Sequence, residues 1–222
     1  MQTPALADMQ AQILPLLSGF ALQSLDLNNP QLQIAQFLTA GYTITFNSQP
    51  GRIDLVAQRG TSLTQPMGEE MTTEKVAELL RGTVLAIAAT VPTARLAVIA
   101  TSAFPHDTIE ESFALILSKA PGLIPPAGVS EVDVRINSRA TITTDRPVGL
   151  NRNVRWQNVM QALVTIQPES GAVFSPPQSI AVLTVDINSV PETVLAQADI
   201  APVYDGIIGH LTSLATGEWN SL

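Results

Sequence analysis

Apolar and polar residues alternate in several stretches of the chain, and this alternation predicts β-strands. Residues 42–46 alternate, a Gln-Pro-Gly turn stands at 49–51, and the alternation resumes at 53–55, which is typical of a β-hairpin. Residues 132–136 alternate in the same way and predict a strand with one solvated face, with 140–144 as a candidate hairpin partner. These stretches indicate antiparallel pairing.

Continuous apolar runs predict further strands. Residues 96–100 and 180–187 are almost entirely apolar, which is the pattern of strands buried on both faces. Residues 154–167 fit helical spacing in their first part and a strand in their last, and we expect a strand at 161–167.

Apolar residues at helical spacing predict amphipathic helices at 6–16, from Thr72 or Thr73 to Pro92, at 107–119 and at 202–215. Thr is a favoured N-cap residue, and Pro cannot continue a helix, so the second of these has a predicted beginning and end. The run Ser189–Glu192 has the spacing of a capping box and predicts a short helix after it.

Hairpins mixed with separate helices favour the α+β class, with a mostly antiparallel sheet and amphipathic helices packed on one of its faces. Parallel pairing around the helices is the alternative. We expect residues 1–222 to form a single globular unit. The stretch 121–130, rich in Pro and Gly, is a candidate seam between two halves, 1–120 and 131–222.

The composition narrows the classes of function. A net charge of -8 opposes nucleic-acid binding, because a phosphate backbone is held by clustered Lys and Arg. No apolar run is long enough to cross a membrane, and no basic residue precedes the apolar stretch 13–22 as it would in a secretory signal. We therefore expect a cytoplasmic protein with no membrane partner.

Few residues suited to catalysis are present, since the chain has no Cys, two His and two Lys. The run from His106 to Glu111 could hold a cation or act as an acid–base pair, but Asp107 or Thr108 with Glu110 or Glu111 also has capping-box spacing, which we favour. Asp186 ends an apolar strand, where catalytic carboxylates often lie, but with Asn188 and Ser189 directly after it a turn or helix-entry role also explains it, and we favour that role. Glycine-rich phosphate loops are missing from the sequence, and no cofactor or metal is expected.

Basic residues gather in one segment, where five of the nine arginines fall beside one of the two tryptophans. These predicted partner-binding residues are Arg135, Arg139, Arg146, Arg152, Arg155 and Trp156. Arg and Trp are common anchors of protein interfaces, and Arg also binds carboxylates and phosphates. We expect self-association through a contact that includes them.

The charged fraction is 14%, against about 25% in an average soluble domain. A surface with so few charges is typical of a subunit that covers part of itself, and a thick single core gives the same low charged fraction. The sequence therefore favours a non-catalytic interaction or assembly protein, self-associating or part of a larger complex. The alternatives are a binding module for an apolar or anionic small molecule, and a hydrolase or transferase that uses Asp186 or the His106–Glu111 group.

Overall fold

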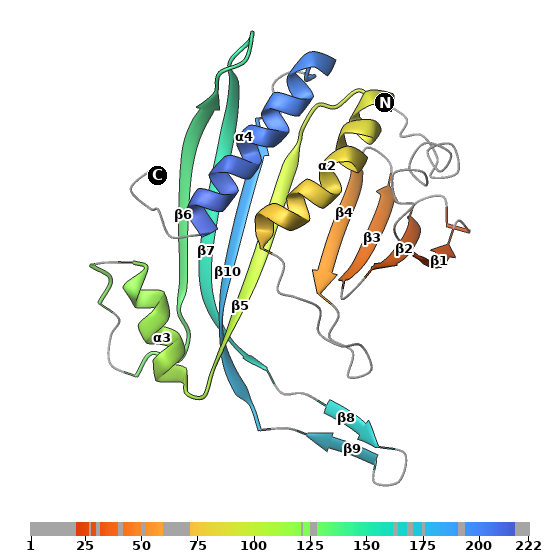
Figure 1. Ribbon diagram of the computed structural model, residues 1–222. Helices are drawn as coiled ribbons and strands as arrows, with labels where there is room; N and C mark the ends of the chain where they lie inside the picture. Colours follow the sequence, from red (N-terminus) through yellow and green to blue (C-terminus); the bar gives the residue numbers. More distant parts are fainter. Residues whose placement is uncertain are drawn as a thin grey trace. The chain divides into compact units, whose positions relative to one another are not determined.

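The computed structural model of this chain consists of two compact units, Met1–Ala94 with Pro191–Tyr204, and Arg95–Val190 with Asp205–Leu222 (Figure 1). The structure describes residues 21–26, 28–29, 32–39, 42–49, 52–59, 72–120, 122–124, 128–161, 164–167, 171–174, 176–190 and 194–215. Every strand pair in these ranges is antiparallel, so the predicted α+β class is confirmed and the parallel alternative is not found there. The helix predicted at 6–16 lies outside the described residues.

The first unit contains a four-stranded meander of β1 (Ala21–Asp26), β2 (Gln33–Thr39), β3 (Tyr42–Gln49) and β4 (Arg52–Arg59), paired in that order. Strands β3 and β4 form the hairpin predicted from the alternation at 42–55. Phe37, Ile44 and Phe46 point to one face, where they form a buried cluster with Leu80 and Ile87 of helix α2 (Thr73–Thr90). This helix therefore covers one face of the meander.

Helix α2 begins and ends where the sequence predicts. Thr72 is its N-cap, with a side-chain oxygen that accepts a hydrogen bond from the Lys75 amide at 3.4 Å, and the helix stops before Pro92. Within the same unit, the buried Tyr204 hydroxyl donates a hydrogen bond to the carbonyl oxygen of Ala77 at 2.7 Å. Tyr204 belongs to helix α4 (Gln197–Ala215), so this bond joins the first turns of α4 to α2.

The second unit is built on a four-stranded sheet with the order β5-β10-β7-β6. Its strands are β5 (Ala97–His106), β6 (Asp133–Ile142), β7 (Val148–Gln161) and β10 (Gln178–Ser189). Strands β8 (Val164–Gln167) and β9 (Gly171–Phe174) form a separate hairpin, and helix α3 spans Ile109–Ser118. The strands β5 and β10 lie on either side of the segment 121–130 in sequence and pair over ten residue pairs, so the sheet joins the two predicted halves.

Two predictions in this unit need correction, and the structure resolves one stretch that the sequence left open. Residues 140–144 are not a hairpin arm, because β6 continues to Ile142 and pairs with β7. Residues 154–161 are strand rather than helix, and the strand expected at 161–167 is present as the end of β7 and as β8. The run at 96–100 belongs to an edge strand whose residues alternate between exposed and half-buried, and is not buried on both faces.

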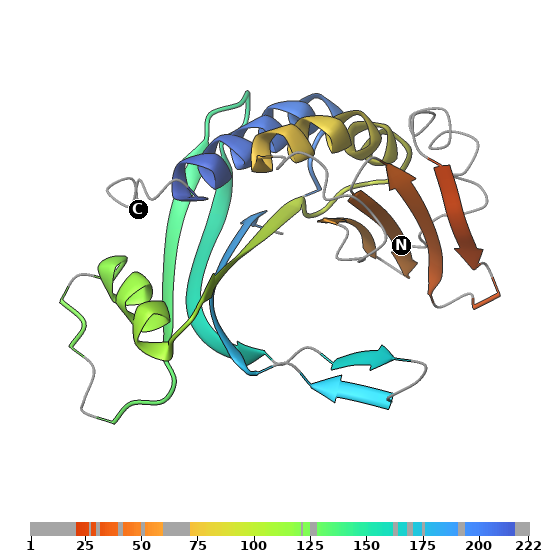
Figure 2. The ribbon, with the colours of Figure 1, turned by 60° about the horizontal axis from the view of Figure 1, so that its bottom comes forward.

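Helices cover one face of this sheet, as the sequence predicts. Ile116 of α3 is fully buried, and α3 contacts β5, β7 and β10. In α4, Gly206 lies directly against Ile142 of β6. Figure 2 shows the four strands as one curved layer. This helix-covered side, the covered face, carries the even-numbered side chains of β5, β6 and β7.

Candidate functional site

The opposite side of the β5-β10-β7-β6 sheet carries a polar surface. We call it the open face, because no helix of the second unit covers it in the part of the chain that the structure describes. Strand register places its side chains in rows across the four strands from β6 to β5. The rows are Asp133–Gln157–Val182–Ala103, Arg135–Arg155–Thr184–Thr101, Asn137–Asn153–Asp186–Ile99 and Arg139–Asn151–Asn188–Ala97.

One carboxylate on the open face is held between two guanidinium groups. Asp133 accepts hydrogen bonds from Arg155 Nε at 3.0 Å and its terminal nitrogen at 2.9 Å, and from Arg135 Nε at 3.3 Å and its terminal nitrogen at 3.0 Å. Hydrogen bonds from Arg155 and then Arg135 lower the pKa of Asp133 to about 2. Both arginines are therefore aligned by one shared, ionised partner.

Amide side chains continue this network on the central strands. Asn151 donates a hydrogen bond to Asn188 at 3.2 Å, and Asn188 donates to the Asp186 carboxylate at 3.0 Å. Asp186, which the sequence places at a strand end, thus lies within β10 on the open face. Three arginines and two aspartates leave this face with one net positive charge, whereas the whole chain carries -8.

The six residues predicted to form one contact are divided between the two faces. Arg135, Arg139 and Arg155 belong to the open face, but Arg152 and Trp156 lie on the covered face, each 4% exposed. Arg146 is in the turn between β6 and β7. The reason is the strand period of two, which sends residues 152 and 156 to the side opposite residue 155. The expected single surface is therefore not formed.

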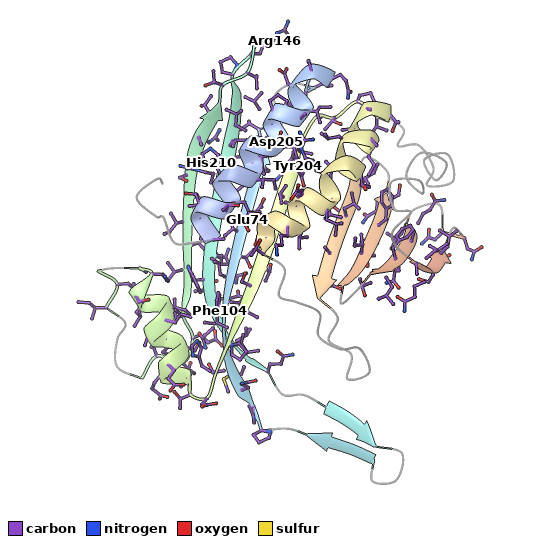
Figure 3. All side chains as sticks on the ribbon, viewed as in Figure 1. Glu74, Phe104, Arg146, Tyr204, Asp205 and His210 are labelled. Carbon is purple, nitrogen blue, oxygen red and sulfur yellow. The ribbon has the colours of Figure 1, made fainter. Side chains whose placement is uncertain are left out.

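Arg152 and Trp156, the two buried residues of this set, make their contacts on the covered face of the sheet. Arg152 donates a hydrogen bond from Nε to Ser138 at 3.1 Å and one from a terminal nitrogen to the carbonyl of Arg139 at 3.3 Å. Burial lowers the pKa of His210 in α4, and the Arg152 guanidinium lowers it further. Figure 3 labels His210 on this helix. Trp156 packs on Phe104 with ring centroids 5.7 Å apart, so its surface is already used within the chain.

The candidate acid–base group is a helix cap. Thr108 and Glu111 form a complete capping box at the start of α3, as the spacing predicts. His106 lies at the end of β5 on the covered face, with its Nε2 atom buried. Asp186 lies on the open face, so these candidates do not converge. The described residues contain no group of His and carboxylates that could hold a metal ion.

The asparagines of the open face were missed at the sequence level. Their signal is present in the segment 151–157, where Asn151, Asn153, Arg155 and Gln157 stand at every second position. Such spacing puts all four side chains on one face of a strand. The buried Arg152 hides this pattern, because it places a charge among the positions that point to the core.

Among the helices that the structure describes, none has the length and apolar character needed to span a membrane. Searches of protein families, of curated proteins and of solved structures found no match to this chain.

Proposed function

We propose that this protein is a non-catalytic assembly subunit that self-associates through the sheet of its second unit. The observation that carries the proposal is the open face, on which polar side chains are held in place by one another. Arg135, Asp133 and Arg155 form one such group, and Asn151, Asn188 and Asp186 form another. Side chains fixed before contact lose less conformational entropy on binding than mobile ones.

Charge supports the same proposal. The open face has one net positive charge on a chain of net charge -8. A second copy of the chain therefore offers this face a surface of opposite average sign, which favours encounter and orientation. The charged fraction of 14% also leaves much of the rest of the surface neutral.

Sedimentation velocity and native mass spectrometry from low to high micromolar concentration test the proposal. We expect a reversible shift from monomer to a defined oligomer. Hydrogen exchange at the two ends of this range should show added protection in β5, β6, β7 or β10. A chain that stays monomeric throughout, or whose added protection lies only in β1–β4, would contradict the proposal.

The two-arginine group supports a second candidate function, binding of an anionic small molecule. Asp133 occupies Arg135 and Arg155 as a carboxylate ligand would, with two hydrogen bonds from each guanidinium. If this group is an anion site, Asp133→Asn should strengthen binding of a dicarboxylate or inorganic phosphate in titration calorimetry. Arg139→Gln, a change on the same strand but outside the group, is the control.

A further inference from the structure

Strand β5 forms one edge of the second sheet. It pairs with β10 over ten consecutive residue pairs, with no register shift, and its other side has no strand partner among the residues that the structure describes. An edge strand presents unpaired backbone groups that can bind another strand.

The hydrogen bonds at the start of β5 reveal which backbone groups point outward. The Leu96 carbonyl accepts a hydrogen bond from the Ser189 amide at 2.8 Å, so residue 96 faces β10. Backbone direction alternates along an antiparallel strand. The N–H and C=O groups of Ala97, Ile99, Thr101 and Ala103 therefore point away from β10. Pro105 presents only a carbonyl on that side, since proline has no N–H.

Strand β5 also lacks the features that protect the other edges of the two four-stranded sheets. Its ten residues, AVIATSAFPH, include no Asp, Glu, Lys or Arg. The other edge strands contain charged residues: Asp133, Arg135 and Arg139 in β6, Asp54 in β4, and Asp26 in β1. Strand β1 also has a register irregularity between Leu22 and Ser24. Charges, irregularities and prolines are the usual means of preventing edge pairing, and β5 has only Pro105, next to its last residue.

We infer that β5 pairs antiparallel with β5 of a second copy, about a two-fold axis at Thr101; this rests on the proposed self-association and places its contact at the edge of the sheet rather than over the polar groups of the open face. Thr101 points its backbone groups outward, so it can exchange two hydrogen bonds with its own copy. The outward backbone groups of Ala97, Ile99, Ala103 and Pro105 pair in the same way, so the whole contact supplies about eight backbone hydrogen bonds.

The sequence of this strand is self-complementary about Thr101. In this register, Ile99 lies opposite Ala103, and on the covered face Val98 lies opposite Phe104, a pair of the β-branched and aromatic kind that stabilises sheets. The exposed Arg95 and Asp107 stand just outside the two ends of β5, so this register brings them near each other. Opposite charges thus meet at both ends of the contact. This match identifies a second copy as the partner, because a two-fold contact must complement itself.

The decisive variant is Thr101→Glu, because the axis places this exposed residue opposite itself. Two glutamates would then face each other and repel. We therefore expect the dissociation constant of the dimer to rise by about tenfold or more. Thr141→Glu is the matched control, since Thr141 is exposed on the open face of the other edge strand, β6. It should leave dimerisation unchanged, as judged by sedimentation velocity.

The register has a test of its own. Thr101→Lys should weaken dimerisation as Thr101→Glu does, but an equimolar mixture of the two variants should form a heterodimer, visible by native mass spectrometry. If Thr101→Glu fails to fold by circular dichroism, the pair Arg95→Asp and Asp107→Arg serves instead. Each single change should then weaken the dimer, and the double change should restore it.

The outcomes separate this inference from the proposed function. A wild-type chain that never dimerises overturns both. A wild-type dimer that withstands both Thr101 variants, or that only Thr141→Glu disrupts, overturns the β5 contact and leaves self-association in place. Added exchange protection at the amides of Ala97, Ile99, Thr101 and Ala103 on dimerisation would support the contact. Its absence from these amides would contradict it.

Discussion

Two glycines of helix α4 provide a direct test of how the second sheet is covered. A Cβ atom added at Gly206 would lie 2.5 Å from Ile142 Cδ1 and 2.9 Å from Cγ1, whereas one added at Gly209 would meet nothing within 4 Å. Both positions are inside the helix. Gly206→Ala and Gly209→Ala therefore make the same chemical change in two different surroundings.

The expected effects have opposite signs. Replacing Gly by Ala inside a helix stabilises it by about 1 kcal/mol, and Gly209→Ala should show this gain. At Gly206 the new methyl group displaces Ile142, and overpacking of this kind costs about 1–3 kcal/mol. The net effect of Gly206→Ala should thus be a loss of up to about 2 kcal/mol. A change of 1 kcal/mol in a chain of this length moves the Tm by about 2–4 °C.

A double-mutant cycle isolates the contact. Ile142→Val removes the Cδ1 atom that lies closest to the added methyl group. In that background Gly206→Ala should cost less, with a coupling energy of about 1 kcal/mol. Urea unfolding followed by circular dichroism measures all four proteins. If Gly206→Ala stabilises as much as Gly209→Ala, α4 does not rest on β6, and the division into covered and open faces is wrong.

Four further measurements check other parts of the structure. The Asp133 carboxylate should titrate at about pH 2 in an NMR experiment. Because its pKa is lower in the folded than in the unfolded chain, its contribution to stability is present above about pH 4 and is lost as the pH falls towards 2. This contribution should stay below about 1 kcal/mol, since Asp133 and its two arginines are largely exposed. Thr108→Ala should cost about 1 kcal/mol in urea unfolding through loss of its capping box. Tyr204→Phe, which removes the hydrogen bond to Ala77, should cost about 1 kcal/mol. Limited proteolysis should cleave first within 121–130, and a first cut elsewhere would count against that seam.

Local signals in the sequence predicted the elements that neighbouring residues determine. The hairpin of β3 and β4 follows from strict alternation around one turn, and α2 follows from the Thr72 cap, the helical stripe and Pro92. The capping box at Thr108 follows from spacing alone. Each of these depends on contacts within a few residues, so a single stretch of sequence contains the information.

Features that depend on strand order could not be predicted in the same way. The apolar run at 96–100 resembles a buried strand, yet β5 lies at an edge because β10, about eighty residues later in sequence, pairs with it on one side. Residues 154–161 of β7 were ambiguous because their apolar positions also fit helical spacing, and the burial of Arg152 could not be predicted because a charge favours an exposed site. Hydrogen bonds to Ser138 and to the Arg139 carbonyl on β6 hold that charge, and only the paired sheet supplies them.

The same strand order limits what the predicted arginine cluster can do. Alternation sends Arg152 and Trp156 to the covered face and leaves Arg135, Arg139 and Arg155 on the open face. Strand β5 contributes its odd-numbered residues to that open face as well. Pairing of two β5 strands would therefore extend the open face across both copies without covering the Asp133 group, which lies on the opposite edge strand, β6.

Self-association and anion binding at Arg135 and Arg155 are thus compatible, and a dimer would present two such groups related by the two-fold axis. A partner with two acidic segments could contact both at once, and its affinity would then exceed that of either group alone.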